Sequence, residues 1–294
     1  MAISKKEMNI HALHKDIRLF ACPLCQSTMK LAEQSRFVCE DNHSFDISRQ
    51  GYIHLAPQAH ATKYDRSLFE ARNNIMTNGF FNPLLEKIID IIHQFNNEQE
   101  QLKMIDAGSG EGSHLAHILS QFPNNQIDGF GIDLAKEGIL RAAKDYPGHS
   151  WVVADLANSP FQDNAFHILL NILSPANYSE FSRILKKNGL FIKVVPGKNY
   201  LKQLRQAFHA DTEREERDPV AQVAEHFTHV KAERMTYHFP LDSKLLESLI
   251  RMTPLTWHAS EDQVKRVLSM DIPFVTVDLT VIIATDSVIE KGEQ

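Results

Sequence analysis

The sequence has 294 residues, of which 43% are hydrophobic and 23% are charged, and its formal net charge is −6. This length corresponds to about two domains, and the composition excludes a wholly disordered chain or a collagen-like repeat. The negative charge argues against a generally basic nucleic-acid binder. No run of about 18 apolar residues is present, and residues 1–13 are polar and do not resemble a secretory signal. We therefore expect a cytoplasmic protein without a membrane span.

The cysteines are concentrated near the N-terminus. The chain has three, Cys22, Cys25 and Cys39, and His43 follows the last of them by four residues. Zinc prefers four tetrahedral nitrogen and sulfur ligands, which two pairs at this spacing supply. The alternatives are three unrelated thiols, or a redox pair at Cys22 and Cys25, which would be expected beside a βαβ pattern. Four protein ligands leave no open position on the metal, so we predict one structural zinc ion in a module spanning residues 1–60.

The N-terminal part is slightly basic. Residues 1–72 carry ten Lys or Arg and eight Asp or Glu, whereas the whole chain is acidic. An anionic polymer such as RNA is therefore expected to bind here, although an ordinary solvated loop explains the same charges. The cationic and aromatic residues of the last part of this segment are Arg49, Tyr52, His54, His60, Lys63, Tyr64, Arg66 and Arg72.

The middle of the chain alternates strand and helix patterns. Asn82 and Pro83 precede a helical repeat of apolar residues at 84–92. Strand-like apolar segments follow at residues 102–105, 127–132, 151–153, 166–173 and 189–195, with helical patterns after the first two. This alternation predicts right-handed βαβ units and a parallel sheet. We expect a linker or helix at residues 61–82 and an α/β domain at residues 83–294.

A glycine-rich loop, residues 106–112, follows the first strand; we call it the donor loop. It contains Asp106, Gly108, Gly110 and Gly112. Nicotinamide-binding loops have the spacing G-x-G-x-x-G, and their pyrophosphate lies at a helix N-terminus, where an acid such as Asp106 would repel it. The acid suits instead the cationic amino-acid end of S-adenosylmethionine.

Two further acids end the next two predicted strands. Asp133 lies 21 residues after Gly112, where an acid accepts hydrogen bonds from ribose hydroxyls. Asp155 is placed to accept from an adenine amino group. Each acid alone is explained as a turn residue, but three at successive strand ends, with the glycine loop on the first, predict an S-adenosylmethionine site. The predicted cofactor-binding residues are Asp106, Gly108, Gly110, Gly112, Asp133 and Asp155.

The last third carries weaker patterns. Residues 198–208 are typical of a helix, and residues 211–218 are a charge run expected in a solvated loop. Residues 230–239 and 274–285 alternate like strands and predict an antiparallel hairpin at the sheet edge, with a packing helix between them. Trp257 is either a core residue or a platform on which a base stacks.

Together these stretches resemble the bacterial 23S rRNA (guanine-N1-)-methyltransferases of the RlmA type. The resemblance is carried by the Cys/His pattern, residues 45–46, 51–53 and 71–72, the donor loop, residues 131–133 and 196–197, and Met252-Thr-Pro with Trp257. It implies a Rossmann-like class I S-adenosylmethionine-dependent methyltransferase domain, of α/β class, preceded by a small zinc-binding module. It implies methyl transfer to N1 of a guanine in a domain II hairpin loop of 23S rRNA, and a homodimer whose zinc domains flank a basic cleft. The family has two branches, one of Gram-negative and one of Gram-positive bacteria, and the Gram-negative branch has an arginine in the stretch that corresponds to residues 171–175. This stretch looks more like the Gram-positive branch, whose methylation is linked to tylosin-type macrolide resistance.

Asn171 and Pro175 are the candidate catalytic residues. They lie at the end of the fourth strand, where amino-directed methyltransferases have an Asn/Asp-Pro-Pro-aromatic motif from which this chain departs. Guanine N1 must lose a proton around transfer, and the base must leave its stack. Asn171 is placed to hold the amide edge of the base, or it is a turn residue, and no general base is identified. Two alternative functions are a small-molecule methyltransferase, which has no need of a zinc module, and a non-catalytic zinc-containing RNA-binding protein, which has no need of an intact donor loop.

Overall fold

The computed structural model describes residues 3–33, 35–56, 65–95, 101–122, 126–209 and 218–287. His60, Lys63 and Tyr64 of the basic segment, and residues 211–217 of the charge run, lie outside the described residues. No helix in the described part of the chain is long and apolar enough to cross a membrane.

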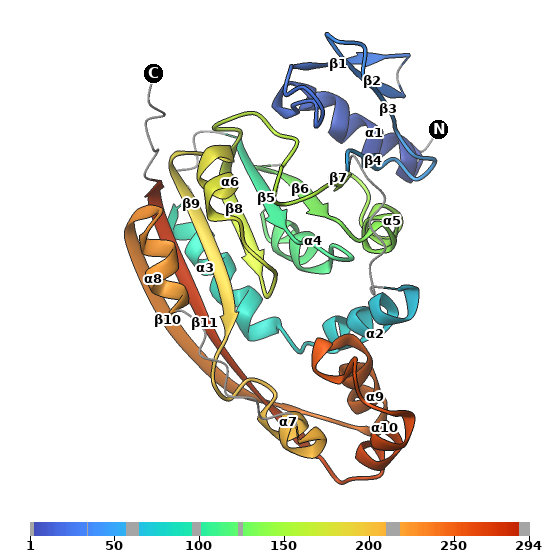
Figure 1. Cartoon of the computed structure of the whole chain (residues 1–294), viewed down its shortest axis with the longest axis vertical. Coiled ribbons are helices and arrows are strands. Elements are labelled where there is room, and N and C mark those ends of the chain that lie inside the picture. The colour runs from blue at the N-terminus through green and yellow to red at the C-terminus, as the bar shows by residue number, and fades with distance from the viewer. Residues whose placement is uncertain are drawn as a thin grey trace.

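An eight-stranded mixed sheet forms the centre of the molecule (Figure 1). Its order is β10-β11-β9-β8-β5-β6-β7-β4. Strands β4 to β9 run parallel, β11 is antiparallel to β9, and β10 is antiparallel to β11. The bounds are β4 (Ile53–His54), β5 (Leu102–Ala107), β6 (Ile127–Asp133), β7 (Ser150–Val153), β8 (Phe166–Ile172), β9 (Leu185–Pro196), β10 (Phe227–Pro240) and β11 (Phe274–Ser287).

The five predicted parallel strands and the edge hairpin are confirmed, although the start of one strand and the start of one helix each differ by four residues from the prediction. β9 begins at Leu185 rather than at residue 189, because an irregularity in its pairing with β8 brings Leu185 opposite Phe166. The helix expected from residue 198 begins only at Lys202. Its start is delayed because Leu201 has a left-handed backbone, with φ of 53°.

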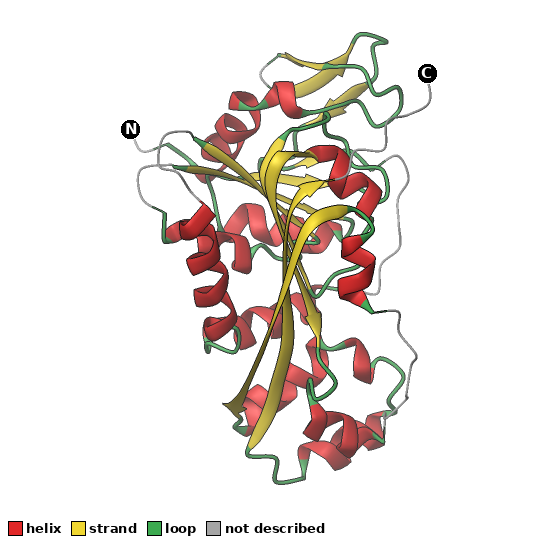
Figure 2. Ribbon diagram, turned by 90° about the vertical axis from the view of Figure 1, so that its left-hand side faces the viewer, coloured by secondary structure: helices red, strands yellow, loops and turns green. Residues whose placement is uncertain are grey.

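Helices cover both faces of the sheet, which Figure 2 shows nearly edge-on. On one face the apolar sides of three helices pack on the strands through residues such as Ile88, Leu115 and Ile139. These helices are α3 (Asn82–Phe95), α4 (Ser113–Ser120) and α5 (Lys136–Asp145). The other face is covered by α6 (Tyr178–Ile184) and α8 (Pro219–Ala224), together with the N-terminal module.

Four helices form a lobe beyond the carboxyl ends of the parallel strands, at the bottom of Figure 1. They are α2 (Arg66–Thr77), α7 (Lys202–Phe208), α9 (Ser243–Met252) and α10 (Glu261–Leu268), with the short turn η2 (Pro254–Thr256). Asp65 starts α2 by accepting a hydrogen bond from the Leu68 backbone N–H at 2.9 Å. Asn74 on α2 donates to Ser248 Oγ on α9 at 2.8 Å, which ties a helix from the first quarter of the chain to the C-terminal lobe.

The N-terminal module has its own small sheet but shares its core with the large one. It contains α1 (Lys5–Lys15), η1 (Ile17–Leu19) and the antiparallel strands β1 (Met29–Ala32), β2 (Arg36–Cys39) and β3 (Ser44–Asp46). The Phe20 ring lies 5.2 Å from that of Phe37 in the module and 5.1 Å from that of Phe161 in the larger domain. Burial of these rings joins the two parts. A division at residue 60 stays a prediction, to which the structure adds that β4 already belongs to the large sheet.

Candidate metal centre and methyl-donor site

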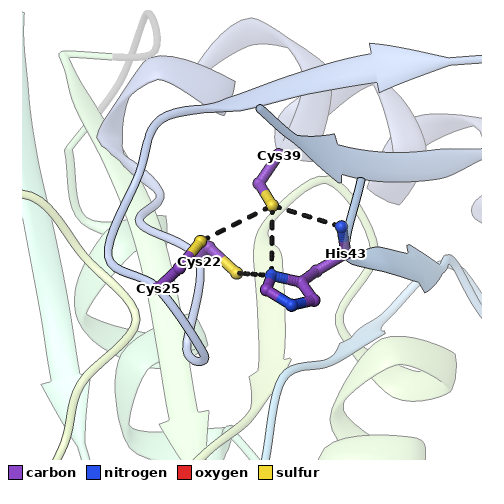
Figure 3. A group of neighbouring side chains, drawn as sticks. All are labelled: Cys22, Cys25, Cys39 and His43. Atoms are coloured by element: carbon purple, nitrogen blue, oxygen red, sulfur yellow. Dashed lines mark hydrogen bonds between the residues drawn. The ribbon is translucent and has the colours of Figure 1, made fainter. Parts of the chain in front are cut away.

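The four predicted zinc ligands lie together (Figure 3). The sulfur atoms of Cys22, Cys25 and Cys39 and a ring nitrogen of His43 all lie within 4.8 Å of one another. Cys25 Sγ is 3.6 Å from Cys39 Sγ, and His43 Nδ1 is 3.6 Å from Cys22 Sγ and 3.4 Å from Cys39 Sγ. Around a tetrahedral zinc with Zn–S bonds of about 2.3 Å, sulfur atoms are about 3.8 Å apart. The donor set therefore fits one four-coordinate zinc ion.

Two tight turns present these ligands. The Gln26 N–H donates to the Cys22 carbonyl at 2.8 Å, and the Asn42 N–H donates to the Cys39 carbonyl at 3.1 Å. Gln26 and Asn42 both have left-handed backbones, which Asn tolerates better than most residues. The His43 backbone N–H also donates to Cys39 Sγ at 3.3 Å, a bond that favours the thiolate form that zinc requires. Because all four ligands come from the protein, the site serves folding rather than catalysis.

The donor loop connects β5 to α4 at the carboxyl edge of the sheet. Gly108, Gly110 and Gly112 all have positive φ, between 57° and 92°, which L side chains rarely adopt. Gly112 also has no room for a larger side chain, because a Cβ there would collide with the Trp151 ring. The three predicted glycines are thus the residues that allow this loop to fold.

Asp106 is the buried acid of the donor loop. The residue is 1% exposed, and neither carboxylate oxygen has a hydrogen-bond partner among the described residues. Burial raises the pKa of this carboxyl to about 7, against the lowering influence of Arg72. A buried, unpartnered acid calls for a cationic partner. The ammonium group of S-adenosylmethionine supplies one, so the residue fits the predicted cofactor.

Asp133 ends β6 and closes the donor loop. One carboxylate oxygen accepts from the Gly110 N–H at 2.8 Å, and the other accepts from the Ala135 N–H at 2.7 Å. Burial nevertheless raises its pKa. Each carboxylate oxygen has a second lone pair, so the predicted acceptance of ribose hydroxyls is compatible with these bonds.

Asp155 lies on the loop after β7, and its neighbour Leu156 reaches the donor loop: the Leu156 side chain lies 3.9 Å from where a Cβ on Gly108 would be. Asp155 Oδ1 accepts from the Ala157 N–H at 2.8 Å, as a turn residue does. The structure brings Asp106, Asp133 and this loop to one edge of the sheet. The contact with adenine stays a prediction.

A buried charge cluster beside the donor loop was not among the residues predicted for the site. Arg72 on α2 places Nε 2.9 Å from Glu111 Oε2, and its Nη2 is 3.4 Å from His114 Nδ1. Glu111 is fully buried. Burial and the Arg72 charge lower the pKa of His114 well below its usual range, so His114 is neutral. The charge of Glu111 between two glycines was the available sequence signal, but its partner is 39 positions earlier in the chain and no spacing rule joins them.

Residues 171–175, which we call the acceptor loop, comprise the last two residues of β8 and the three residues after it. Asn171 is fully buried, and its Nδ2 donates to the carbonyls of Ala107 at 2.6 Å and Pro175 at 3.0 Å. Its Oδ1 accepts from Lys193 Nζ. These bonds tie the acceptor loop to the end of β5, while Pro175 is exposed at the rim. A catalytic role of Asn171 and Pro175 stays a prediction.

Comparison with known proteins agrees with the two-part organisation. Residues 20–63 match the zinc-ribbon family described as RlmA, N-terminal, and residues 104–189 match a methyltransferase domain. The chain is 40% identical over 275 residues to Bacillus subtilis YxjB, whose name places it among the 23S rRNA (guanine-N1-)-methyltransferases; the match covers 91% of this chain and 97% of that protein. It is 30% identical over 254 residues to the 23S rRNA (guanine(748)-N(1))-methyltransferase of Streptomyces fradiae, covering 85% and 90%.

A solved structure shares the fold. A methyltransferase from an antibiotic biosynthesis pathway of Anabaena variabilis matches with a TM-score of 0.50 and 13% identity, over 68% of this chain and 96% of that one. The methyltransferase domain is thus a class I, S-adenosylmethionine-dependent fold, and the ribbon before it holds a structural zinc site. Since its relatives match along nearly its whole length, the chain belongs to the RlmA-type family of 23S rRNA (guanine-N1-)-methyltransferases.

Proposed function

We propose that this rRNA methyltransferase modifies N1 of a guanine in a domain II hairpin loop of 23S rRNA, and that this guanine corresponds to the one named for the Streptomyces fradiae relative. The observation that carries the proposal is the zinc ribbon packed directly on a methyltransferase sheet whose donor loop is intact. The ribbon exposes Arg18, Lys30 and Arg49, together with Leu24, which is 55% exposed. Exposed cations and apolar groups suit phosphates and unstacked bases.

The chemistry requires orientation more than activation. S-adenosylmethionine, when bound, supplies a methyl group already activated by its sulfonium. Asp106 faces the cationic end of this donor and Asp133 its ribose. The acceptor loop borders the flipped guanine, with Asn171 shaping the loop and Pro175 at its rim. Holding the base and the methyl group in line accounts for much of the acceleration that such a site can supply.

The first test is methylation with labelled S-adenosylmethionine and 23S rRNA from cells that lack the enzyme, followed by mapping of the labelled nucleotide. We expect label on N1 of one guanine of the domain II hairpin. Label on another base would contradict the proposed site and keep the enzyme class. Binding of the donor without any RNA labelling would favour a small-molecule methyltransferase instead.

We also propose that the enzyme acts as a homodimer, in which two ribbons border one RNA-binding cleft. One ribbon offers few cations, so two together would neutralise more phosphates of a hairpin. Light scattering during size-exclusion chromatography should give twice the mass of one chain. A monomer at micromolar concentration that is fully active would contradict this.

A further inference from the structure

Lys193 on β9 is buried beside the acceptor loop. The residue is 5% exposed, and its Nζ donates to Asn171 Oδ1 and to the Ser174 carbonyl, the latter at 2.6 Å. The register of β8 and β9 places Lys193 directly opposite Asn171. A lysine from the neighbouring strand thus holds the acceptor loop at two points.

The acceptor loop has a strained backbone that these bonds hold. Leu173 has a φ of 52°, in the left-handed region, and its N–H donates to the Val194 carbonyl at 3.0 Å. Such strain persists only where the surroundings impose it, and it is common at functional sites. The next residue, Ser174, packs so closely on Gly108 that a Cβ there would collide with its hydroxyl. The strained loop therefore lies against the donor loop.

The ammonium of Lys193 has no carboxylate partner in the part of the chain that the structure describes. Burial alone lowers the pKa of this amine, to about 8. Three charged or titratable groups on the elements around it have other partners: Asp278 pairs with Arg234, Glu180 pairs with Arg183, and His167 bonds to Lys186. Asp106 has no hydrogen-bond partner among the described residues, and the cation that lowers its pKa is Arg72 rather than Lys193. A buried cation without an anion is costly, which points to a function in which an anion forms nearby.

Methyl transfer to guanine creates such an anion. The N1–H bond breaks and the proton passes to solvent, which leaves a negative charge shared by N1 and O6. The N1 electron pair then forms the bond to the methyl carbon, while the bond from that carbon to sulfur breaks and its electron pair stays on sulfur. A fixed positive charge near the acceptor loop favours the deprotonated base without having to reorganise.

We propose that Lys193 is a positioning residue for methyl transfer, whose buried ammonium holds the acceptor loop against the donor loop and favours loss of the guanine N1 proton. This inference rests on the proposed function. Lys193 acts through Asn171 and Ser174 rather than by touching the base.

The test compares Lys193→Met, which removes the charge at similar volume, with Lys193→Arg, which keeps it. The turnover rate with saturating 23S rRNA fragment is measured from pH 6 to 10, and the affinity for S-adenosylhomocysteine is measured by calorimetry. For wild type we expect the rate to fall above about pH 8, where Lys193 loses its proton. Lys193→Arg should retain its rate there, because a guanidinium stays charged. Lys193→Met should lose at least about tenfold in rate near pH 7 and should need a pH about one unit higher to reach the same rate. Its affinity for S-adenosylhomocysteine should change less than about threefold.

Lys186→Met is the matched control, because Lys186 is a half-buried lysine on the same strand that bonds to His167. Its pH profile should equal that of wild type. An unchanged profile of Lys193→Met would overturn the inference, as would a loss of cofactor affinity as large as the loss of rate. If Lys193→Arg were inactive and the wild-type rate at alkaline pH depended on Lys193, the lysine would be the acceptor of the N1 proton. That result would also overturn the inference. If Lys193→Met fails to fold, Lys193→Gln replaces it.

The wild-type reaction separates the two proposals. If wild type labels the hairpin guanine and the variants match it, the function stands and the inference is wrong. If wild type labels no RNA, the proposed function itself fails, and the inference fails with it.

Discussion

In the folded protein without the donor, ionisation of the Asp106 carboxyl is unfavourable. Burial raises its pKa from 3.8 to about 7, so the folded state binds a proton more tightly than the unfolded state does. Stability of the donor-free protein should therefore decrease as the pH rises from about 4 to 7. Donor affinity should rise over the upper part of this range, because only the ionised acid attracts the ammonium group.

Asp106→Asn should remove the pH dependence of both the stability and the donor affinity. We expect a donor-free protein that is at least as stable as wild type at pH 7.5, with at least about tenfold weaker donor binding, which corresponds to about 1.4 kcal/mol. Scanning fluorimetry and calorimetry at several pH values measure the two quantities. Asp145→Asn, at the end of α5 and paired with Arg141 on the surface, should change neither. A variant that binds the donor as tightly as wild type would contradict the role of Asp106.

Gly112 is the donor-loop position at which packing adds to backbone strain. Gly112→Ala should lower the free energy of unfolding by about 2–4 kcal/mol. The new Cβ would collide with the Trp151 ring, and alanine would also have to adopt an unfavourable positive φ. Gly148→Ala is the control: its φ is similar, at 93°, but a Cβ there meets only Met8 Cε at 3.6 Å. It should cost about 1 kcal/mol. Urea unfolding of both variants measures the difference, and equal values would contradict the packing argument.

At the scale of elements, α2 is attached to the donor loop by an ion pair between the partly exposed Arg72 and the fully buried Glu111. Arg72→Gln leaves Glu111 buried without its cation and should lower the free energy of unfolding by about 3–5 kcal/mol. Arg66→Gln on the same helix is the control, because its pair with Glu70 is at the surface and such pairs contribute about 0–1 kcal/mol. Denaturant unfolding with coincident fluorescence and circular dichroism signals tests both. Equal losses would show that Arg72 does not hold the helix in place.

At the scale of the whole molecule, the shared aromatic core predicts that the zinc ribbon and the methyltransferase domain unfold together. Removing zinc with a chelator should lower the melting temperature of the entire chain, because Phe20 packs both on Phe37 of the ribbon and on Phe161 of the larger domain. Metal release, read with a zinc-sensitive dye, and loss of far-ultraviolet circular dichroism should have the same midpoint. A methyltransferase transition unchanged by the chelator would show two independent units.

Local patterns in the sequence were sufficient for the parallel strands β5 to β9, the edge hairpin and the zinc ligands, but not for the short strand β4 or for the helices α8 and α10. Strand periodicity located the five parallel strands and the edge hairpin, because burial of both faces requires continuous apolar runs. The zinc ligands and the donor-loop glycines were predicted because metal coordination and positive φ each demand particular residue types at short spacing. Because these constraints are local, they can be recognised in the sequence alone.

Contacts between distant residues were decided only by the tertiary structure. Arg72 meets Glu111 because α2 folds back over the donor loop, and Lys193 meets Asn171 because β8 and β9 are neighbours. The sharing of Phe20 between the ribbon and the large sheet is of the same kind. Buried charges and rings find their partners through the packing of whole elements, and no spacing in the sequence encodes that packing. The sequence alone therefore determined the enzyme class and its ligands, whereas the tertiary structure decided which side chains hold the two loops together.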